Sequence, residues 1–133
     1  MVYAAVGEFS NTAILQKFTA NGAVTKGDVV TITGAAASTV ATCDASGNAP
    51  YAVATSTVAT TETVMCVVYG EVSVTASGNC YTGAIVGGTS GSAVVVAKPF
   101  ETLAPAAGPC PLGKVTVGAA DTGIATVFVG LVV

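Results

Sequence analysis

The sequence contains no histidine and no arginine, and only 8% of its 133 residues are charged. Without histidine, Ser-His and Cys-His nucleophilic pairs are excluded. Recognition of phosphate groups depends on clustered basic residues, whereas the basic residues here are scattered singly. We therefore expect no enzymatic activity and no binding to nucleic acid or to an anionic membrane surface. The basic residues are Lys17, Lys26, Lys98 and Lys114.

The carboxylates are equally dispersed, and most of them fall in turn sequences where a charged side chain stays solvated. Asp28 follows Lys26-Gly27 and is expected to bond the backbone of its own turn. The chain has no EF-hand loop, and its glycine-rich stretches lack the Lys-Ser/Thr of a phosphate loop. The sequence therefore predicts no catalytic residue, no metal ligand and no cofactor.

The four cysteines lie far apart, without a C-x₂-C pair. Together with the absence of histidine, this spacing argues against a zinc site. Two alternatives stay open for them. They are buried, inert thiols, with Cys66 as a small core residue, or two of them form a disulfide after release from the cell, in a pairing that spacing does not determine. The cysteines are Cys43, Cys66, Cys80 and Cys110.

Long apolar runs are missing as well, since no stretch approaches the ~18 apolar residues that span a bilayer. The first residues lack the basic and apolar regions of a secretion signal, so we expect synthesis in the cytoplasm without processing. The sequence is nevertheless 52% hydrophobic. Because Val and Ala carry most of this apolar character, it indicates β-structure and not a membrane span.

Val, Thr, Ile and Tyr dominate the chain and are separated by Gly, Asn-Gly and Ser-Gly turn signals, the pattern of an all-β protein. Alanine-rich pieces are too short, and too broken by Gly or Pro, to form helices. The run Val64–Tyr69 is apolar on both strand faces, so we expect it to be central and covered on both sides. Strands are predicted at Val29–Thr33, Ser38–Thr42, Tyr51–Ala54, Thr63–Thr75, Ala84–Val86, Ala93–Ala97, Leu112–Val117 and Ile124–Val133.

An internal duplication with an offset of about 60 residues organises the chain. The opening Val24–Val30 is similar to Cys80–Val86, and under this offset Pro50 falls on Pro111 and Gly70 on Gly130. Each copy is too small to bury an apolar face alone, so we expect the copies to share a core. The fold class is therefore a small β-barrel or sandwich built from two similar β units, with an N-terminal arm. Residues 1–20 are the arm and first strand, and residues 21–133 are the barrel-like domain, with repeats at about 24–72 and 80–133.

The N-terminal segment is apolar ahead of the first turn at Asn21-Gly22. Residues 10–18 are either an ordinary first strand, with Ile14, Gln16 and Phe18 on one face, or a strand that extends a partner's sheet. We favour an arm for residues 1–9, because an apolar terminus should not remain in water and strand addition binds a partner without charge. The predicted contact residues of this arm are Val2, Tyr3, Val6 and Phe9.

Four of the five prolines fall between Lys98 and Pro111, and this clustering predicts a stiff, irregular loop because proline cannot donate to a sheet. Phe100 and Leu103 in this loop either anchor it to the barrel or make a secondary partner contact.

The segment Asn21–Val30 resembles a recurring element of the tailed-phage head decoration, or capsid cement, proteins. In that family a Gly-x-Val-x-x-Gly-Asp turn follows an N-terminal strand, as Gly22–Asp28 does here. The strand Tyr51–Ala54 before a small-residue turn, and the apolar strand ending in Tyr69–Val72, also fit. The scheme recurs through Val129-Gly130, so the resemblance covers most of the chain.

The resemblance implies a β-barrel-like protomer, a homotrimer, that sits on the outer surface of a capsid in the virion and clamps subunits of the major capsid protein. The chain departs from the family in an insertion around Ala35–Asn48, in the proline-rich loop and in its cysteines, which affects the geometry of the oligomer. Two other functions stay open. A cell-surface or fibre-type β-module would call for a secretion signal, and a small-ligand-binding β-barrel would call for convergent polar groups in an apolar cavity.

Overall fold

In the computed structural model the described residues are 5–32, 39–42, 51–88, 93–96 and 111–130, and within them the chain forms strands and turns without a helix. The all-β prediction is confirmed, and every predicted strand segment contains a strand. None of the described residues belongs to a helix that could cross a membrane. The strands are β1 (Ile14–Ala20), β2 (Val29–Ile32), β3 (Thr39–Thr42), β4 (Ala52–Ala54), β5 (Thr63–Ala76), β6 (Ile85–Gly88), β7 (Ala93–Val96), β8 (Pro111–Val117) and β9 (Ile124–Val129).

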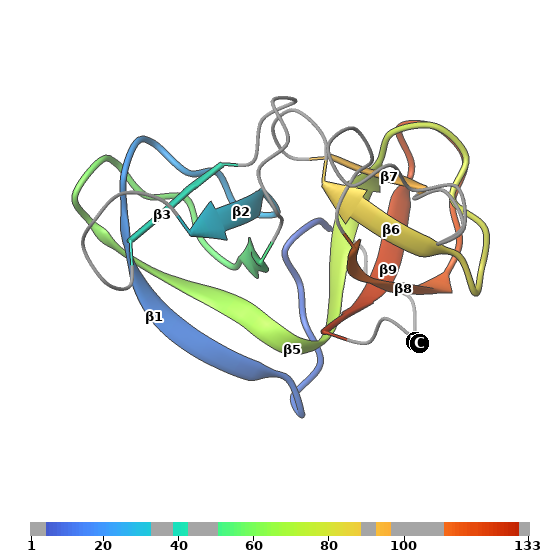
Figure 1. The fold of residues 1–133 in the computed structure, drawn as a ribbon, viewed down its shortest axis with the longest axis horizontal. Helices are drawn as coiled ribbons and strands as arrows, with labels where there is room; N and C mark the ends of the chain where they lie inside the picture. The colour runs from blue at the N-terminus through green and yellow to red at the C-terminus, as the bar shows by residue number, and fades with distance from the viewer. Residues whose placement is uncertain (1–4, 33–38, 43–50, 89–92, 97–110, 131–133) are drawn as a thin grey trace.

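The strands form two small barrels that share the long strand β5 (Figure 1). In the first lobe the pairing runs β1-β3-β2-β4-β5, and β5 pairs back to β1. In the second lobe it runs β5-β7-β6-β8-β9, and β9 pairs back to β5. The β1–β3 and β5–β7 pairings are parallel and the others are antiparallel. Closing each sheet on itself removes most open edges, and the two similar β units of the expected fold are present.

The two lobes also repeat their turns. Val24 bridges to Val58 in the first lobe, and Cys80 bridges to Ala119 at the same place in the second. The turn before each second strand has a glycine with φ +92°, Gly27 in one lobe and Gly83 in the other. The N–H of each glycine donates to a strand across the barrel. Gly27 N donates to Ala54 O at the end of β4 at 2.9 Å, and Gly83 N donates to Val115 O, its counterpart in β8, at 2.8 Å.

The lobes pack through a row of valines that crosses three neighbouring strands. Val53 of β4 is paired with Val29 of β2 on one side and with Val67 of β5 on the other. All three are fully buried and belong to the same core as the interior of the second lobe. Burying a valine contributes about 1.5–3 kcal/mol, so this row fixes the arrangement of the lobes. The interior of the first lobe is a separate cluster around Phe18 and Val64.

The central run of β5 is covered less completely than its sequence predicts. β5 is central, since it pairs with β1 and β4 in the first lobe, and Val64, Cys66 and Val67 are buried. Met65 and Tyr69, however, are exposed. The expectation of cover on both faces is wrong at these two positions, because along Val64–Tyr69 only Val67 packs into the core of the second lobe.

Candidate partner-binding surface

The Gly-Asp turn of the decoration-protein motif is a structural turn. Asp28 is 6% exposed, and its Oδ2 accepts a hydrogen bond of 2.9 Å from Thr25 N. Asp28 N donates in turn to Thr25 O at 2.9 Å. The predicted bond from Asp28 to its own turn is confirmed, and this carboxylate faces the turn and not a partner.

Other described carboxylates also bond neighbouring chain segments. Glu62 accepts from Ala59 N at 2.6 Å, and Asp121 accepts from Gly78 N at 2.7 Å. Glu71 accepts from the hydroxyl of Thr116 at 2.9 Å. These contacts stabilise turns and strand pairs, and none of them brings two carboxylates together for acid–base work.

Cys66 and Cys80 are buried free thiols. Burial raises the pKa of Cys66 to about 12 and also raises the pKa of Cys80, so both remain protonated near neutral pH and are poor nucleophiles. Cys66 is the predicted core residue. Cys43 and Cys110 lie outside the described residues. Over the described ranges no group of three or more His, Cys, Asp or Glu could hold a metal ion.

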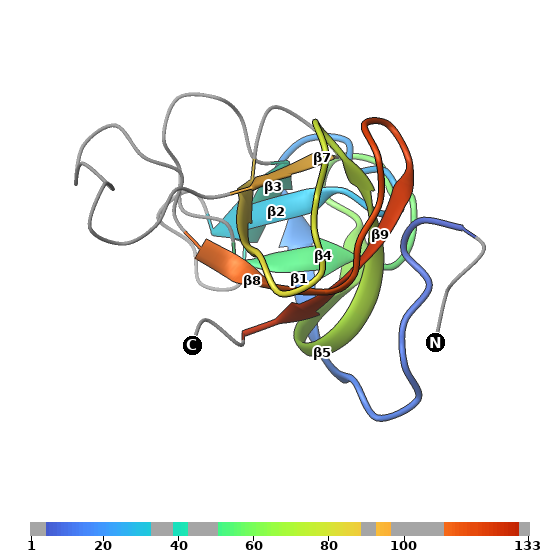
Figure 2. The same ribbon diagram turned by 90° about the vertical axis from the view of Figure 1, so that its right-hand side faces the viewer.

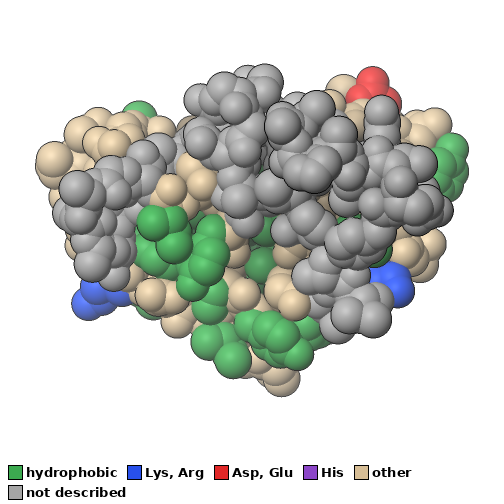
Figure 3. Space-filling view, in the orientation of Figure 1, with side chains coloured by type: hydrophobic (Ala, Val, Ile, Leu, Met, Phe, Trp, Pro, Cys, Tyr) green, Lys and Arg blue, Asp and Glu red, His purple; other side chains and the backbone are tan. Residues whose placement is uncertain are grey.

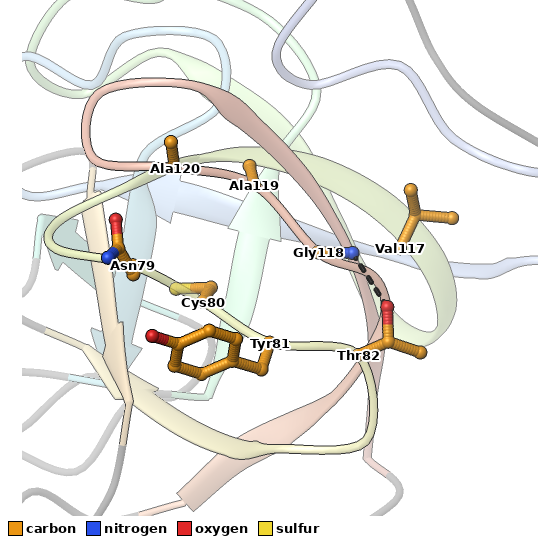
Figure 4. A pocket seen from close by; sticks show the side chains of 8 residues that line it. All are labelled: Asn79, Cys80, Tyr81, Thr82, Val117, Gly118, Ala119 and Ala120. Atoms are coloured by element: carbon orange, nitrogen blue, oxygen red, sulfur yellow. Dashed lines mark hydrogen bonds between the residues drawn. The ribbon is translucent and has the colours of Figure 1, made fainter.

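A hollow of about 580 Å³ lies at the second lobe, between the segment before β6 and the segment after β8 (Figure 4). Its polar side chains are engaged with the turns around it: Thr82 Oγ1 accepts from Gly118 N at 3.1 Å, and Asn79 Oδ1 accepts from Asp121 N at 3.1 Å. Tyr81, 68% exposed, is the one large side chain of its lining. The hollow therefore offers an aromatic contact, and burial keeps the Cys80 thiol of its lining protonated by raising its pKa.

The described part of the N-terminal arm lies on its own β5 (Figure 2). Gly7 N donates to Ser73 O at 2.8 Å, and Ser73 N donates to Glu8 O at 2.9 Å. Phe9 forms an antiparallel bridge with Val72. Residues 7–10 thus make a strand addition within the chain itself.

The predicted contact residues of the arm differ in their exposure to solvent. Val6 is half-buried and lies against Gly27, where an added Cβ would come within 2.8 Å of Val6 Cβ. Phe9 keeps 39% of its surface exposed. Val2, Tyr3, Phe100 and Leu103 lie outside the described residues, so their predicted contacts stay predictions.

Large apolar side chains other than the predicted contact residues are exposed near the bend of β5. Ile14 is paired with Tyr69, and both are exposed. The Tyr69 ring packs edge-to-face on Phe128 with centroids 5.1 Å apart. Figure 3 shows hydrophobic side chains gathered on the molecular surface at this bend. The sequence hint for these exposed side chains is the set of alternate residues Met65, Val67 and Tyr69, which share one face of β5. Of these three, only Val67 is covered by the second lobe.

Tyr51 is a further exposed aromatic residue, on the first lobe. Its ring packs edge-to-face on the buried Phe18, with centroids 5.8 Å apart, and its hydroxyl donates to Gln16 Oε1 at 3.4 Å. Gln16 and Phe18 therefore lie on the same face of β1, as expected for a strand. Ile32 and Met65 are further exposed apolar residues of this lobe. The surface offers aromatic and aliphatic side chains with few charges among them.

No family model and no curated protein match the sequence. Among solved structures the chain is similar to the N base of head fiber gp8.5 of bacteriophage phi29, with a TM-score of 0.63. The two are 13% identical, and the likeness covers 90% of this chain and 95% of that chain. At this identity the likeness shows a shared fold.

Proposed function

We propose that the chain is a structural virion protein that decorates the outer surface of a phage capsid by binding the major capsid protein. The observation that carries this proposal is the fold likeness to a phage head fiber base, which spans nearly the whole of both chains. The resemblance of the Asn21–Val30 turn to that of capsid cement proteins points the same way by an independent route.

The surface supports attachment by apolar contact. Exposed apolar side chains lie on the first lobe and at the bend of β5, namely Tyr51, Tyr69 and Ile14. Tyrosines that a partner buries on binding are frequent anchors of protein interfaces. Since only 8% of the residues are charged, long-range charge steering contributes little. Binding should therefore change little with salt.

A fibre-type β-module is the second candidate, because the similar structure is described as the base of a head fiber. In that function the chain would be the capsid-proximal module of a longer fibre. Both candidates require attachment to the head, and they differ in whether a further segment is joined to the chain. A small-ligand-binding barrel is not favoured, since the polar side chains of the hollow at Asn79 and Thr82 bond neighbouring turns.

The test is co-sedimentation of the full chain with capsids assembled from the phage's major capsid protein, at several salt concentrations. We expect saturable binding that falls less than about threefold when salt is raised tenfold. Replacing Tyr69 by Ser should weaken binding more than the same change at Tyr81, the exposed tyrosine of the hollow on the second lobe. Absence of binding by the unchanged chain at every salt concentration would refute the proposal.

The role of the arm is tested separately by removing residues 1–4, which leaves the bonds of Gly7 and Glu8 to β5 in place. Loss of capsid binding by this folded variant would show that Val2 and Tyr3 make the capsid contact. Undiminished binding would contradict the arm and leave the exposed surface of the barrels as the contact.

A further inference from the structure

Two threonines hold a backbone conformation that normally requires glycine. Thr61 has φ +72° and Thr122 has φ +65°, and among the described residues they are the only ones other than glycine with positive φ. This conformation is unfavourable for any residue with a Cβ, and most of all for a β-branched one. At these two positions the chain therefore keeps a side chain at a cost in stability.

The two threonines occupy the same place in the two lobes. Thr61 lies in the turn that leads into β5 and Thr122 in the turn that leads into β9, and these strands begin toward opposite ends of the molecule in Figure 1. Thr61 N donates to Ala20 O at 2.8 Å, and Thr122 N donates to Ala76 O at 2.9 Å. Ala20 and Ala76 are buried and are the last residues of β1 and β5. The same backbone bond thus fixes the strained conformation in both repeats.

Contacts within the described chain do not account for the two side chains. Both threonines are exposed, so neither side chain belongs to a core. Thr122 Oγ1 donates to the carbonyl of its neighbour Asp121 at 2.6 Å, a bond that water can replace at an exposed site. Over the described ranges the Thr61 hydroxyl has no hydrogen-bond partner. Backbone strain that the fold itself does not require is typical of a functional site.

The two turns are built to present these side chains rigidly. Glu62 N donates to Ala59 O at 3.1 Å, and Gly123 N donates to Ala120 O at 2.9 Å, so each turn is closed by a bond across its threonine. Because the turns are already ordered, a partner can contact the threonine methyl and hydroxyl groups without the entropy cost of ordering a loop. Two equivalent contact points on one chain fit a partner that presents the same surface twice. Identical subunits side by side in a capsid shell meet this condition.

We infer that Thr61 and Thr122 are equivalent contact residues, through which one chain binds two neighbouring subunits of the major capsid protein. This inference rests on the proposed function and names contacts by which it would act. A second copy of the chain is a poorer partner. If each of the two turns bound a further copy, the contacts would extend into an open assembly and would not close.

The test is replacement of each threonine by glycine, which relieves the unfavourable φ and removes the side chain. Thr61→Gly and Thr122→Gly should each weaken co-sedimentation with capsids by about fivefold or more. Both variants should unfold at the same or a higher denaturant concentration than the unchanged chain. Ala59→Gly and Ala120→Gly place a glycine at an exposed position of the same turns and keep the threonines. These two controls should bind as the unchanged chain does.

The variant with both threonines replaced should weaken binding by about the product of the two single effects, because the contacts lie in separate lobes. Unchanged binding of the glycine variants, or weakening by only one of them, would overturn the inference and leave the proposed function standing. A lower unfolding midpoint would also overturn it, since the threonines would then stabilise their turns. A changed oligomer mass in light scattering would assign the turns to a second copy and overturn the capsid contact. Absence of capsid binding by the unchanged chain would refute both proposals.

Discussion

Gly70 lies directly against Ala13, so that a Cβ at Gly70 would be 2.7 Å from Ala13 Cα. The second barrel repeats this contact, since a Cβ at Gly130 would be 2.8 Å from Cδ2 of Tyr69. Both glycines have positive φ, +128° and +87°. At Gly70 the partner of β5 changes from β1 to β9, with Tyr69 paired to Ile14 and Gly70 paired to Val129. The absence of a side chain therefore allows one strand to serve two barrels.

Gly70→Ala should lower the free energy of unfolding by about 2–4 kcal/mol, since it combines an unfavourable φ with a clash against backbone. Chemical denaturation followed by circular dichroism measures the change. Gly78→Ala is the matched control, because Gly78 has φ +84° and open space around its Cβ position, and it should cost about 1 kcal/mol. Equal losses in the two variants would show that the contact with Ala13 does not matter.

Asp28→Ala should destabilise the protein by about 1–3 kcal/mol, because it leaves Thr25 N without its acceptor in a part-buried hydrogen bond. Asp121→Ala removes a comparable bond to Gly78 N at an exposed turn, where water replaces the carboxylate, and should cost less than about 1 kcal/mol. Thermal and chemical unfolding of both variants give the comparison. A smaller loss at Asp28 than at Asp121 would contradict the structural role of the Gly-Asp turn.

The Cys66 thiol predicts a loss of stability at high pH. Its pKa is raised by burial from 9.0 to about 12 in the folded chain. Between these values the thiol ionises only in the unfolded chain, so its contribution is complete below pH 9 and declines as pH rises towards 12. From pH 8 to pH 10 the loss from this group is about 1.4 kcal/mol. Cys66→Ala should show a correspondingly smaller fall in unfolding free energy over that interval, and an identical fall would refute the assignment.

The chain should form a homotrimer in solution. Exposed side chains such as Ile14, Tyr51 and Tyr69, together with a surface poor in charge, favour burial between subunits. Light scattering coupled to size exclusion should give about three times the chain mass of 12.8 kDa. A stable monomer at micromolar concentration would contradict this expectation.

The strands were largely predictable because β-branched runs between glycine turns fix local conformation without reference to distant residues. The duplication was also predictable from the similarity of Val24–Val30 to Cys80–Val86. In the structure, equivalent bridges and glycine turns recur in the two lobes. The contact surface was not predictable in this way. Val67 and Met65 are both apolar neighbours on one strand, yet one is fully buried and the other exposed.

By itself, the sequence determined the class of the protein: a β fold of two similar units, a self-bonded Asp28 turn and Cys66 as a core residue, because each depends on residue type and short-range spacing. Only the tertiary structure decided that residues 7–10 add a strand to β5. The physical reason is that strand pairing is made by backbone groups common to every residue. Which edge is filled therefore depends on where the barrels place their strands, and not on the side chains of the edge alone.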